Sequence, residues 1–237
     1  MPQDSNRKSD FIDSRVSRPT SLSSKEISQY WSQKLKEQAM FSARTTTKEY
    51  LDEVKSILHD YVTGSTEVKE GPNEGDPMTM GKGRARILMY EKLMDLGLVG
   101  PEDGDSNRID DLASSIRLNL IIDTQNEIAH SIDQLKTASD PIQKIINPCW
   151  ELVRNELRVK PRNWMQRWHE AASLVMWQGV AKNTDRFIAK KDSPIWQELG
   201  NAPDGLGNPY PPFAFNSGMG WELVSQDEID ELGLEFG

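Results

Sequence analysis

The sequence predicts an α+β protein that is mostly α-helical, with a helical N-terminal half and a small mixed, Trp-rich C-terminal half. Two observations predict this class. Apolar residues recur at helical spacing in several segments before residue 140. Six of the seven tryptophans lie at or after position 150, among prolines, glycines and short strand-like runs. At 237 residues, the chain has room for one domain or two small ones.

Residues 1–24 are predicted to be a flexible Ser-rich arm. They hold seven serines and two prolines but few apolar side chains. Such a composition cannot bury enough surface to offset the entropy that is lost on ordering. We therefore expect the ordered body to begin near residue 25.

Residues 25–140 are predicted to be a helical region. Ser23 and Glu26 have the spacing of a capping box before the first helix. Thr46 and Glu49 repeat that spacing before a second helix, which Gly64 should end.

A linker rich in Gly, Pro and charge is expected at residues 64–83 within this region. A third helix is expected from about residue 84 to 96, followed by Gly97. The most regular helical spacing of apolar residues predicts a long fourth helix over about 109–136, capped by Asp105 or Ser106. Its expected buried face includes Ile116 and Leu120.

Residues 141–237 are predicted to be a small mixed α/β region. Strands are expected at residues 150–154 and 187–189. Short helices are expected around residues 164–168, after Pro194, and after Ser225, which has a capping-box partner in Glu228. Residues 201–220 should form an extended loop, because Pro and Gly punctuate them.

The negative charge gathers at the C-terminal end. The formal net charge is −9, and nine of the 37 acidic residues follow Lys191, beyond which no Lys or Arg occurs. Residues 1–191 are therefore balanced in charge. An acidic C-terminal end is unfavourable for broad binding of phosphate backbones.

Several kinds of chemistry find no support in the residues. The single cysteine, Cys149, excludes an intrachain disulfide and a multi-cysteine zinc site. No apolar run is long enough for a transmembrane helix. No nucleophile, base and stabilising group stand at a known catalytic spacing. We therefore expect no enzymatic activity, no cofactor, no metal, no small-molecule substrate and no membrane partner.

Two segments are candidate binding surfaces. The first alternates basic and aromatic residues and could hold single-stranded or packaged DNA through Arg154, Arg158, Lys160, Arg162 and Arg167; the same pattern also suits tryptophans in a small core covered by arginine stems. The second spans residues 209–221, where Phe213, Phe215 and Trp221 either close the C-terminal core or anchor a protein partner.

Five segments carry a family resemblance. They are residues 117–125 (RLNLIIDTQ), 148–154 (PCWELVR), 161–168 (PRNWMQRW), 191–196 (KDSPIW) and 211–221 (PPFAFNSGMGW). Together they resemble the minor head proteins of tailed bacteriophages, in the head-morphogenesis group often called Mu F-like. The resemblance spans about residues 40–235. Many relatives carry a run with Cys and His near the C-terminal end, whereas residues 211–219 contain neither, so no metal is implied here.

This resemblance implies a virion structural protein that acts in head assembly near the portal vertex. Its expected partners are the portal and major capsid proteins and, further, packaged DNA. Its expected locations are the host cytoplasm during assembly and then the virion head. The main alternative is a DNA-binding module that uses the basic and aromatic segment at residues 154–168. An enzyme, such as a toxin domain fused to a head protein, is a third hypothesis.

Overall fold

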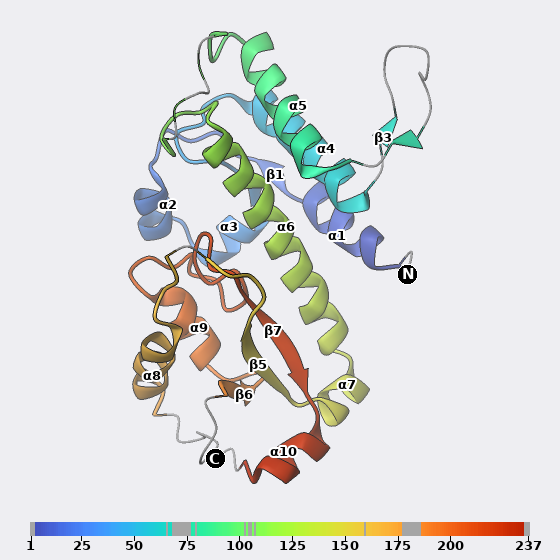
Figure 1. Ribbon diagram of the computed structural model, residues 1–237, viewed down its shortest axis with the longest axis vertical. Helices are drawn as coiled ribbons and strands as arrows, with labels where there is room; N and C mark the ends of the chain where they lie inside the picture. Colours follow the sequence, from blue (N-terminus) through green and yellow to red (C-terminus); the bar gives the residue numbers. More distant parts are fainter. Residues whose placement is uncertain are drawn as a thin grey trace. The chain divides into compact units, whose positions relative to one another are not determined.

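A computed structural model describes residues 3–64, 66–67, 77–78, 80–101, 103, 106, 108–158, 160–176 and 186–234 (Figure 1). The chain divides into two compact units, unit 1 at Met1–Ala129 and unit 2 at His130–Gly237. About 53% of the described residues are helical and 12% are in strands, which confirms the α+β, mostly helical class. The division falls within a single helix, α6 (Ser115–Ala138), 11 residues before the expected boundary at 140/141.

Unit 1 is helical and begins earlier than predicted. Its helices are α1 (Gln3–Asp13), α2 (Ser24–Tyr30), α3 (Gln33–Gln38), α4 (Lys48–Thr63), α5 (Lys82–Asp95) and the first part of α6. Two-residue strands β1 (Val16–Ser17) and β2 (Ala39–Met40) pair in parallel, and β3 (Thr66–Glu67) pairs antiparallel with β4 (Pro77–Met78). The core gathers apolar residues of α1, α4, α5 and α6, among them Ile12, Leu58, Met89, Leu93, Leu118 and Ile122.

The prediction of a flexible arm is wrong for the described residues 3–24. Ile12 of α1 is fully buried in the core of unit 1, and α1 packs on α4. Arg15 is also buried and donates to the Gln125 side chain and to the Lys36 carbonyl. These polar anchors lie far away in the sequence, so the composition of residues 1–24 alone does not reveal them.

The residues that begin and end the helices of unit 1 were predicted with mixed success. The Ser23 capping box is confirmed, since Ser23 N–H donates to Glu26 Oε2 at 2.8 Å and Glu26 N–H donates to Ser23 Oγ at 3.3 Å. Gly64 ends α4 with a φ of +79°, as expected. The second capping box is wrong, because Thr47 occupies the cap position and makes no side-chain cap bond.

The linker prediction at residues 64–83 is tested only in part. Residues 65, 68–76 and 79 lie outside the described residues, and α5 already begins at Lys82. Gly97 follows α5 with a φ of +64°, as predicted.

The long helix α6 is confirmed, but its start and its buried face differ from the prediction. It begins at Ser115 rather than near residue 109, and Asp105 lies outside the described residues. Leu118 and Ile122 are buried, whereas Ile116 is exposed and Leu120 is half-buried. The buried face includes polar residues such as Gln125, so the apolar spacing alone gave the wrong phase.

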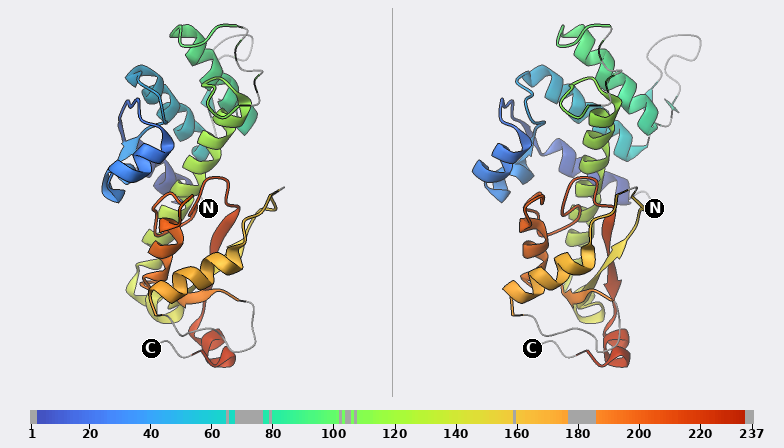
Figure 2. Two further views of the ribbon diagram at one scale, coloured as in Figure 1. Left: turned by 90° about the vertical axis from the view of Figure 1, so that its left-hand side faces the viewer. Right: turned by 60° about the vertical axis from the view of Figure 1, so that its left-hand side comes forward.

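Unit 2 is built on a three-stranded antiparallel sheet with the order β6-β5-β7. The strands are β5 (Cys149–Arg154), β6 (Ile188–Lys190) and β7 (Met219–Val224), and the helices after α6 are α7 (Pro141–Ile146), α8 (Trp164–Leu174), α9 (Ile195–Asn201) and α10 (Gln226–Leu232). Strand β5 pairs with β7 over its full length, from Cys149 opposite Val224 to Arg154 opposite Met219 (Figures 1 and 2). The predicted strands and the three short helices are present, whereas α7 and β7 were not predicted.

Candidate functional site

The aromatic residues of unit 2 meet in one buried cluster. Trp168 of α8 lies 5.5 Å from Trp196 of α9, measured between ring centroids, and Trp196 lies 5.5 Å from Trp221 of β7. Trp221 in turn stacks on Trp150 of β5 at 4.9 Å. Phe213 joins the cluster 6.1 Å from Trp221. Rings in tilted and edge-to-face contact at these distances add packing energy to the area they bury.

The three aromatic residues that were candidates for a partner interface differ in their exposure to solvent. Phe213 and Trp221 are 0% and 4% exposed, so they close the core and cannot anchor a partner from this position. Phe215 is 36% exposed. The interface hypothesis is therefore wrong for Phe213 and Trp221, and it applies only to Phe215.

Hydrogen bonds to Gly218, which has a positive φ, hold the 213–221 segment against the end of β5. Gly218 has a φ of +65°, and its carbonyl accepts hydrogen bonds from the N–H groups of Asn155 at 2.9 Å and Glu156 at 3.1 Å. A Cβ atom at this position would lie 2.5 Å from the Glu156 carbonyl oxygen. Glycine is thus required for this close approach.

Arginines of the basic segment converge on one carboxylate, Asp204. Arg167 Nη1 lies 3.0 Å from Asp204 Oδ1, and Arg162 Nε donates to Asp204 Oδ2. Arg162 also donates to the Phe215 carbonyl at 3.0 Å. We call this set of Arg162, Arg167 and Asp204 the arginine node.

Arg167 is the buried member of the node. Its side chain is 8% exposed, its Nε donates to the Leu199 carbonyl at 3.1 Å, and its guanidinium lies 4.7 Å from the Trp164 ring centroid. Burial lowers the pKa of Arg167, while the Asp204 charge opposes this shift. The guanidinium therefore acts as a cross-link between α8, α9 and the loop that follows α9.

The five basic residues proposed for nucleic-acid contact have unequal surroundings. Arg154 and Lys160 are exposed. Arg158 is half-buried and pairs with Glu156 at 2.8 Å, and Arg162 and Arg167 belong to the arginine node. The structure does not bring the five charges together on one open face, and a buried, paired guanidinium such as that of Arg167 is not available to a phosphate.

Substituting Asp204→Asn should reduce stability in a pH-dependent way. Burial alone would raise the pKa of Asp204, but the hydrogen bond from Arg162 and the charges of Arg167 and Arg162 hold it below its usual value of 3.8. A carboxyl with a lowered folded-state pKa stabilises the protein above its unfolded pKa, and this stabilisation is lost as the pH falls through the folded value.

At pH 6–7 we expect Asp204→Asn to cost about 1 kcal/mol or less, because the carboxylate is half exposed to solvent. This cost should shrink below about pH 4. Urea unfolding from pH 7 to pH 3 measures it, with Asp192→Asn, an exposed carboxylate in the same unit, as the control for the loss of one negative charge. A cost that stays constant down to pH 3 would contradict the expectation.

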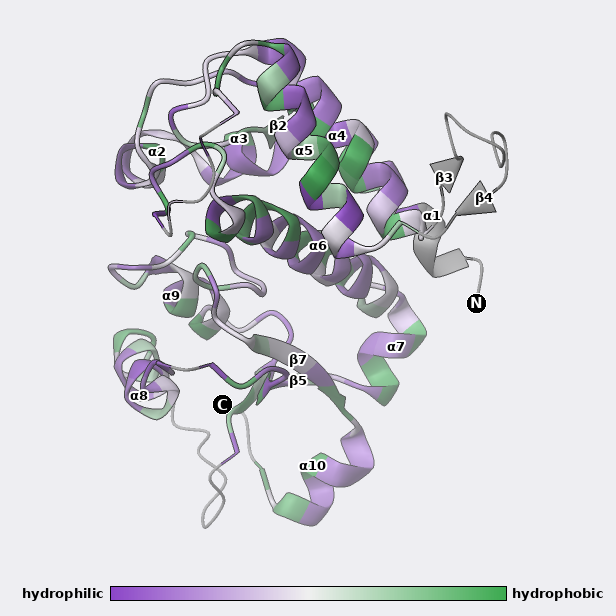
Figure 3. Ribbon diagram, turned by 45° about the horizontal axis from the view of Figure 1, so that its top comes forward, coloured by the Kyte–Doolittle hydropathy of each residue, from purple (hydrophilic) through white to green (hydrophobic). Residues whose placement is uncertain are grey.

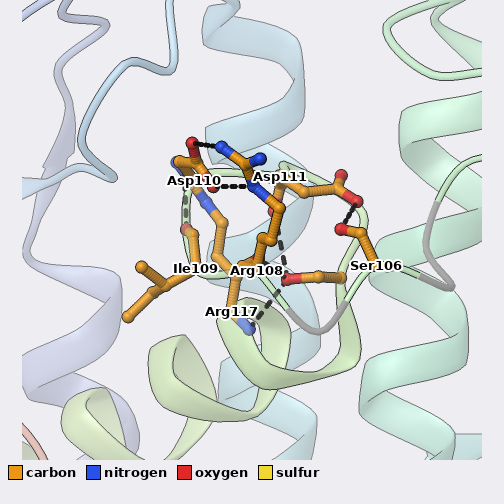
Figure 4. Close-up of polar contacts among 7 residues, drawn as sticks. Ser106, Arg108, Ile109, Asp110, Asp111 and Arg117 are labelled. Atoms are coloured by element: carbon orange, nitrogen blue, oxygen red, sulfur yellow. Dashed lines mark hydrogen bonds and ion pairs between the residues drawn. The ribbon is translucent and has the colours of Figure 1, made fainter.

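A second polar cluster surrounds the start of α6 in unit 1 (Figure 4). We call it the Arg117 cluster; it contains Arg108, Asp110, Asp111 and Arg117. Arg117 is buried and donates to the Ala43 carbonyl and to Ser42 Oγ, the latter at 3.0 Å. Asp110 pairs with Arg108 at 2.7 Å, and this bond lowers the pKa of Asp110 to about 2. Asp111 accepts from the Ala113 N–H at 2.9 Å. The bonds of Arg117 tie the start of α6 to the segment before α4, whereas Asp110 and Asp111 make contacts within the turn before α6.

Among the described residues there is no reactive cysteine, no cluster of metal ligands and no membrane-spanning helix. Cys149 is buried, and burial raises its thiol pKa to about 12, so it is not a nucleophile at neutral pH. Within these residues, no group of three or more His, Cys, Asp or Glu side chains is placed to hold a metal ion. None of the described helices is long and apolar enough to cross a membrane.

Comparisons of the chain with protein-family models, with curated proteins and with solved structures found no match.

Sequence reasoning missed Asp204 and the Leu199 carbonyl, on which the arginine node depends. Both lie more than 30 residues from Arg167 in the chain, and neither belongs to a recognisable motif. The only signal was indirect: an Arg three residues after a Trp on an amphipathic helix suits a guanidinium that stacks on the ring.

Proposed function

We propose that this chain is a minor head protein of a tailed bacteriophage, a virion structural component that acts in head assembly near the portal vertex. One observation supports it most. Three segments that carry the family resemblance, residues 161–168, 191–196 and 211–221, supply Trp164, Trp168, Trp196, Phe213 and Trp221 to one buried cluster. The aromatic residues of these segments are thus packing determinants of one module, which suits a scaffold rather than a reaction.

The surroundings of the polar groups agree with this proposal. The charged groups of the arginine node and of the Arg117 cluster bind other groups of the same chain, and the Cys149 thiol is buried. A protein that works by binding rather than by chemistry needs a stable scaffold and a surface. In this proposal, its partners are the portal and major capsid proteins, and it acts in the host cytoplasm before it becomes part of the head.

The test is incorporation into heads. The chain should be co-expressed with the portal and major capsid proteins of the same genome, and the heads purified on a density gradient. We expect the chain to sediment with them, at a copy number on the scale of the portal ring and far below that of the major capsid protein. Quantitative mass spectrometry measures this ratio. A chain absent from heads that are otherwise assembled would overturn the proposal.

DNA binding through the 154–168 segment remains the second hypothesis, and the exposure of Arg154 and Lys160 is the observation that favours it. A salt titration of single-stranded DNA binding tests it. Five phosphate contacts would give a log–log slope of about −3.5, whereas two would give about −1.4.

Because Arg162 and Arg167 are engaged internally and Arg158 pairs with Glu156, we expect a slope no steeper than that for two contacts. The double variant Arg154→Gln/Lys160→Gln should abolish this salt-dependent binding of DNA. Fluorescence anisotropy with a labelled oligonucleotide gives both values. A steep slope that survives the double variant would show that the basic segment opens to bind DNA, contrary to our expectation.

A further inference from the structure

Helix α7 exposes most of its apolar surface. Ile142, Ile145 and Ile146 are 64%, 74% and 51% exposed, and α7 has no buried residue. Green, hydrophobic segments mark this short helix in Figure 3. Isolated apolar side chains are common on surfaces, but three on one short helix form a patch.

The helix is held in place by polar contacts rather than by its isoleucines. Asp140 caps its start and accepts from the Ile142 N–H at 2.9 Å. Near its end, Lys191 Nζ donates to the Gln143 carbonyl at 3.3 Å, and Asn147 donates to the Gln143 side chain at 3.0 Å. Stability of unit 2 therefore does not explain why the outer positions are isoleucine.

Charges of both signs lie at the same end of unit 2 as this apolar patch. Lys144 is exposed between the isoleucines, and Lys191 lies beside the same helix. The acidic helix α10 is at the same end of the sheet, because Cys149, three residues after α7, pairs with Val224, two residues before α10 (Figures 1 and 2). On α10, Asp227, Asp230 and Glu231 are exposed.

We propose that α7 and α10 together form a self-association surface, whose occupant is the same surface of a second copy of this chain. A surface that carries lysines beside acids complements itself under a two-fold rotation, which brings α7 of each copy toward α10 of the other. A partner of one charge sign would be repelled by half of the surface. The isoleucines would form the dry centre of the contact and the charges its rim. This inference does not depend on the proposed function.

Sedimentation velocity of the full chain tests the proposal. The patch is smaller than the interfaces of stable complexes. We therefore expect a weak dimer with a dissociation constant of about 1–100 μM. Ile145→Asp should raise this constant at least about tenfold. Leu157→Asp is the matched control: Leu157 is 91% exposed in the same unit but follows the opposite end of β5, so its substitution should leave the constant unchanged.

Charge reversal gives a second, independent readout. Lys144→Glu and Glu231→Lys should each weaken the dimer, and the double variant should restore at least part of the affinity. Glu231 lies in the last turn of α10, where a lysine suits the helix dipole, so the variant should fold.

Three results would overturn the proposal. The wild-type chain could stay monomeric up to about 1 mM, well above the dissociation constant expected for a weak dimer. The two aspartate variants could dimerise alike. The charge reversals could fail to rescue one another while each weakens the dimer. A monomeric wild type would mean that α7 and α10 do not form a self-association surface.

Discussion

Phe213→Ala should lower the free energy of unfolding by about 3–5 kcal/mol, because it removes a fully buried ring and leaves a cavity. Phe213 is 0% exposed and contacts Trp164, Trp196 and Trp221, which come from three separate elements. The loss is therefore expected to affect the whole aromatic cluster rather than one contact. Urea unfolding followed by far-ultraviolet circular dichroism measures the effect without relying on the altered tryptophan environment.

Phe215→Ala is the control that the chain itself offers. It removes the same side chain two residues away, in the same Pro- and Gly-bounded segment, but at a position that is 36% exposed. We expect a cost of about 1 kcal/mol or less. Equal costs at the two positions would mean that the 213–221 segment packs differently.

The pair also decides what remains of the partner-anchor hypothesis for this segment. If Phe215→Ala keeps its stability but loses incorporation into heads, then Phe215 contacts a partner. If the Phe215→Ala variant is normal in both respects, the segment serves the core alone. Phe213→Ala cannot decide this question, since an unfolded unit 2 would fail to assemble for any reason.

The elements that were predicted correctly have local signals. The Ser23 capping box and the Ser225 cap each depend on two residues three positions apart, although at Ser225 only the bond from the Glu228 N–H to the Ser225 side chain is present. Gly64 and Gly97 adopt the left-handed conformations that end α4 and α5. Strand β5 was predicted from its run of apolar and β-branched residues. Such signals act within one turn or one strand, so a short window of sequence contains them.

The elements that were missed depend on distant contacts. Helix α1 has only Phe11 and Ile12 as apolar anchors, and Ile12 finds its partners in the core that other helices build. The phase of α6 was wrong because buried polar residues share its inner face: Gln125 accepts from Arg15, 110 positions away. No periodicity of apolar residues can report a polar pair of this kind.

The candidate site likewise combines a local signal, which the sequence contains, with distant contacts, which it does not reveal. The sequence showed that the 154–168 segment is basic and aromatic, and it left open whether the arginines cover a core or face a ligand. Asp204 decides the matter for Arg162 and Arg167, since charges that end on a common carboxylate are used within the fold. That α7 and α10 lie at the same end of the sheet likewise follows from the register of β5 with β7, and β7 was not predicted.

Arg167→Leu should destabilise the protein by about 2–3 kcal/mol. Leucine keeps part of the apolar stem but leaves the Leu199 carbonyl without its charged donor, and a hydrogen bond to a charged group is worth about 1.5–3 kcal/mol. Asp204 keeps Arg162 as a partner, so the full cost of an orphaned buried carboxylate does not arise. Chemical unfolding at pH 7 measures the change.

Arg167→Lys separates the charge of Arg167 from its shape. A lysine retains the positive charge near Asp204, but it lacks the planar fork that reaches the Leu199 carbonyl and stacks 4.7 Å from the Trp164 ring centroid. Its cost should fall between those of Arg167→Leu and the exposed control Arg154→Leu, which should lie within about 0.5 kcal/mol of the wild type. If Arg167→Leu and Arg154→Leu instead had equally small costs and lost DNA affinity together, both guanidinium groups would be facing phosphates, and the basic segment would be a nucleic-acid surface rather than the cover of an aromatic core.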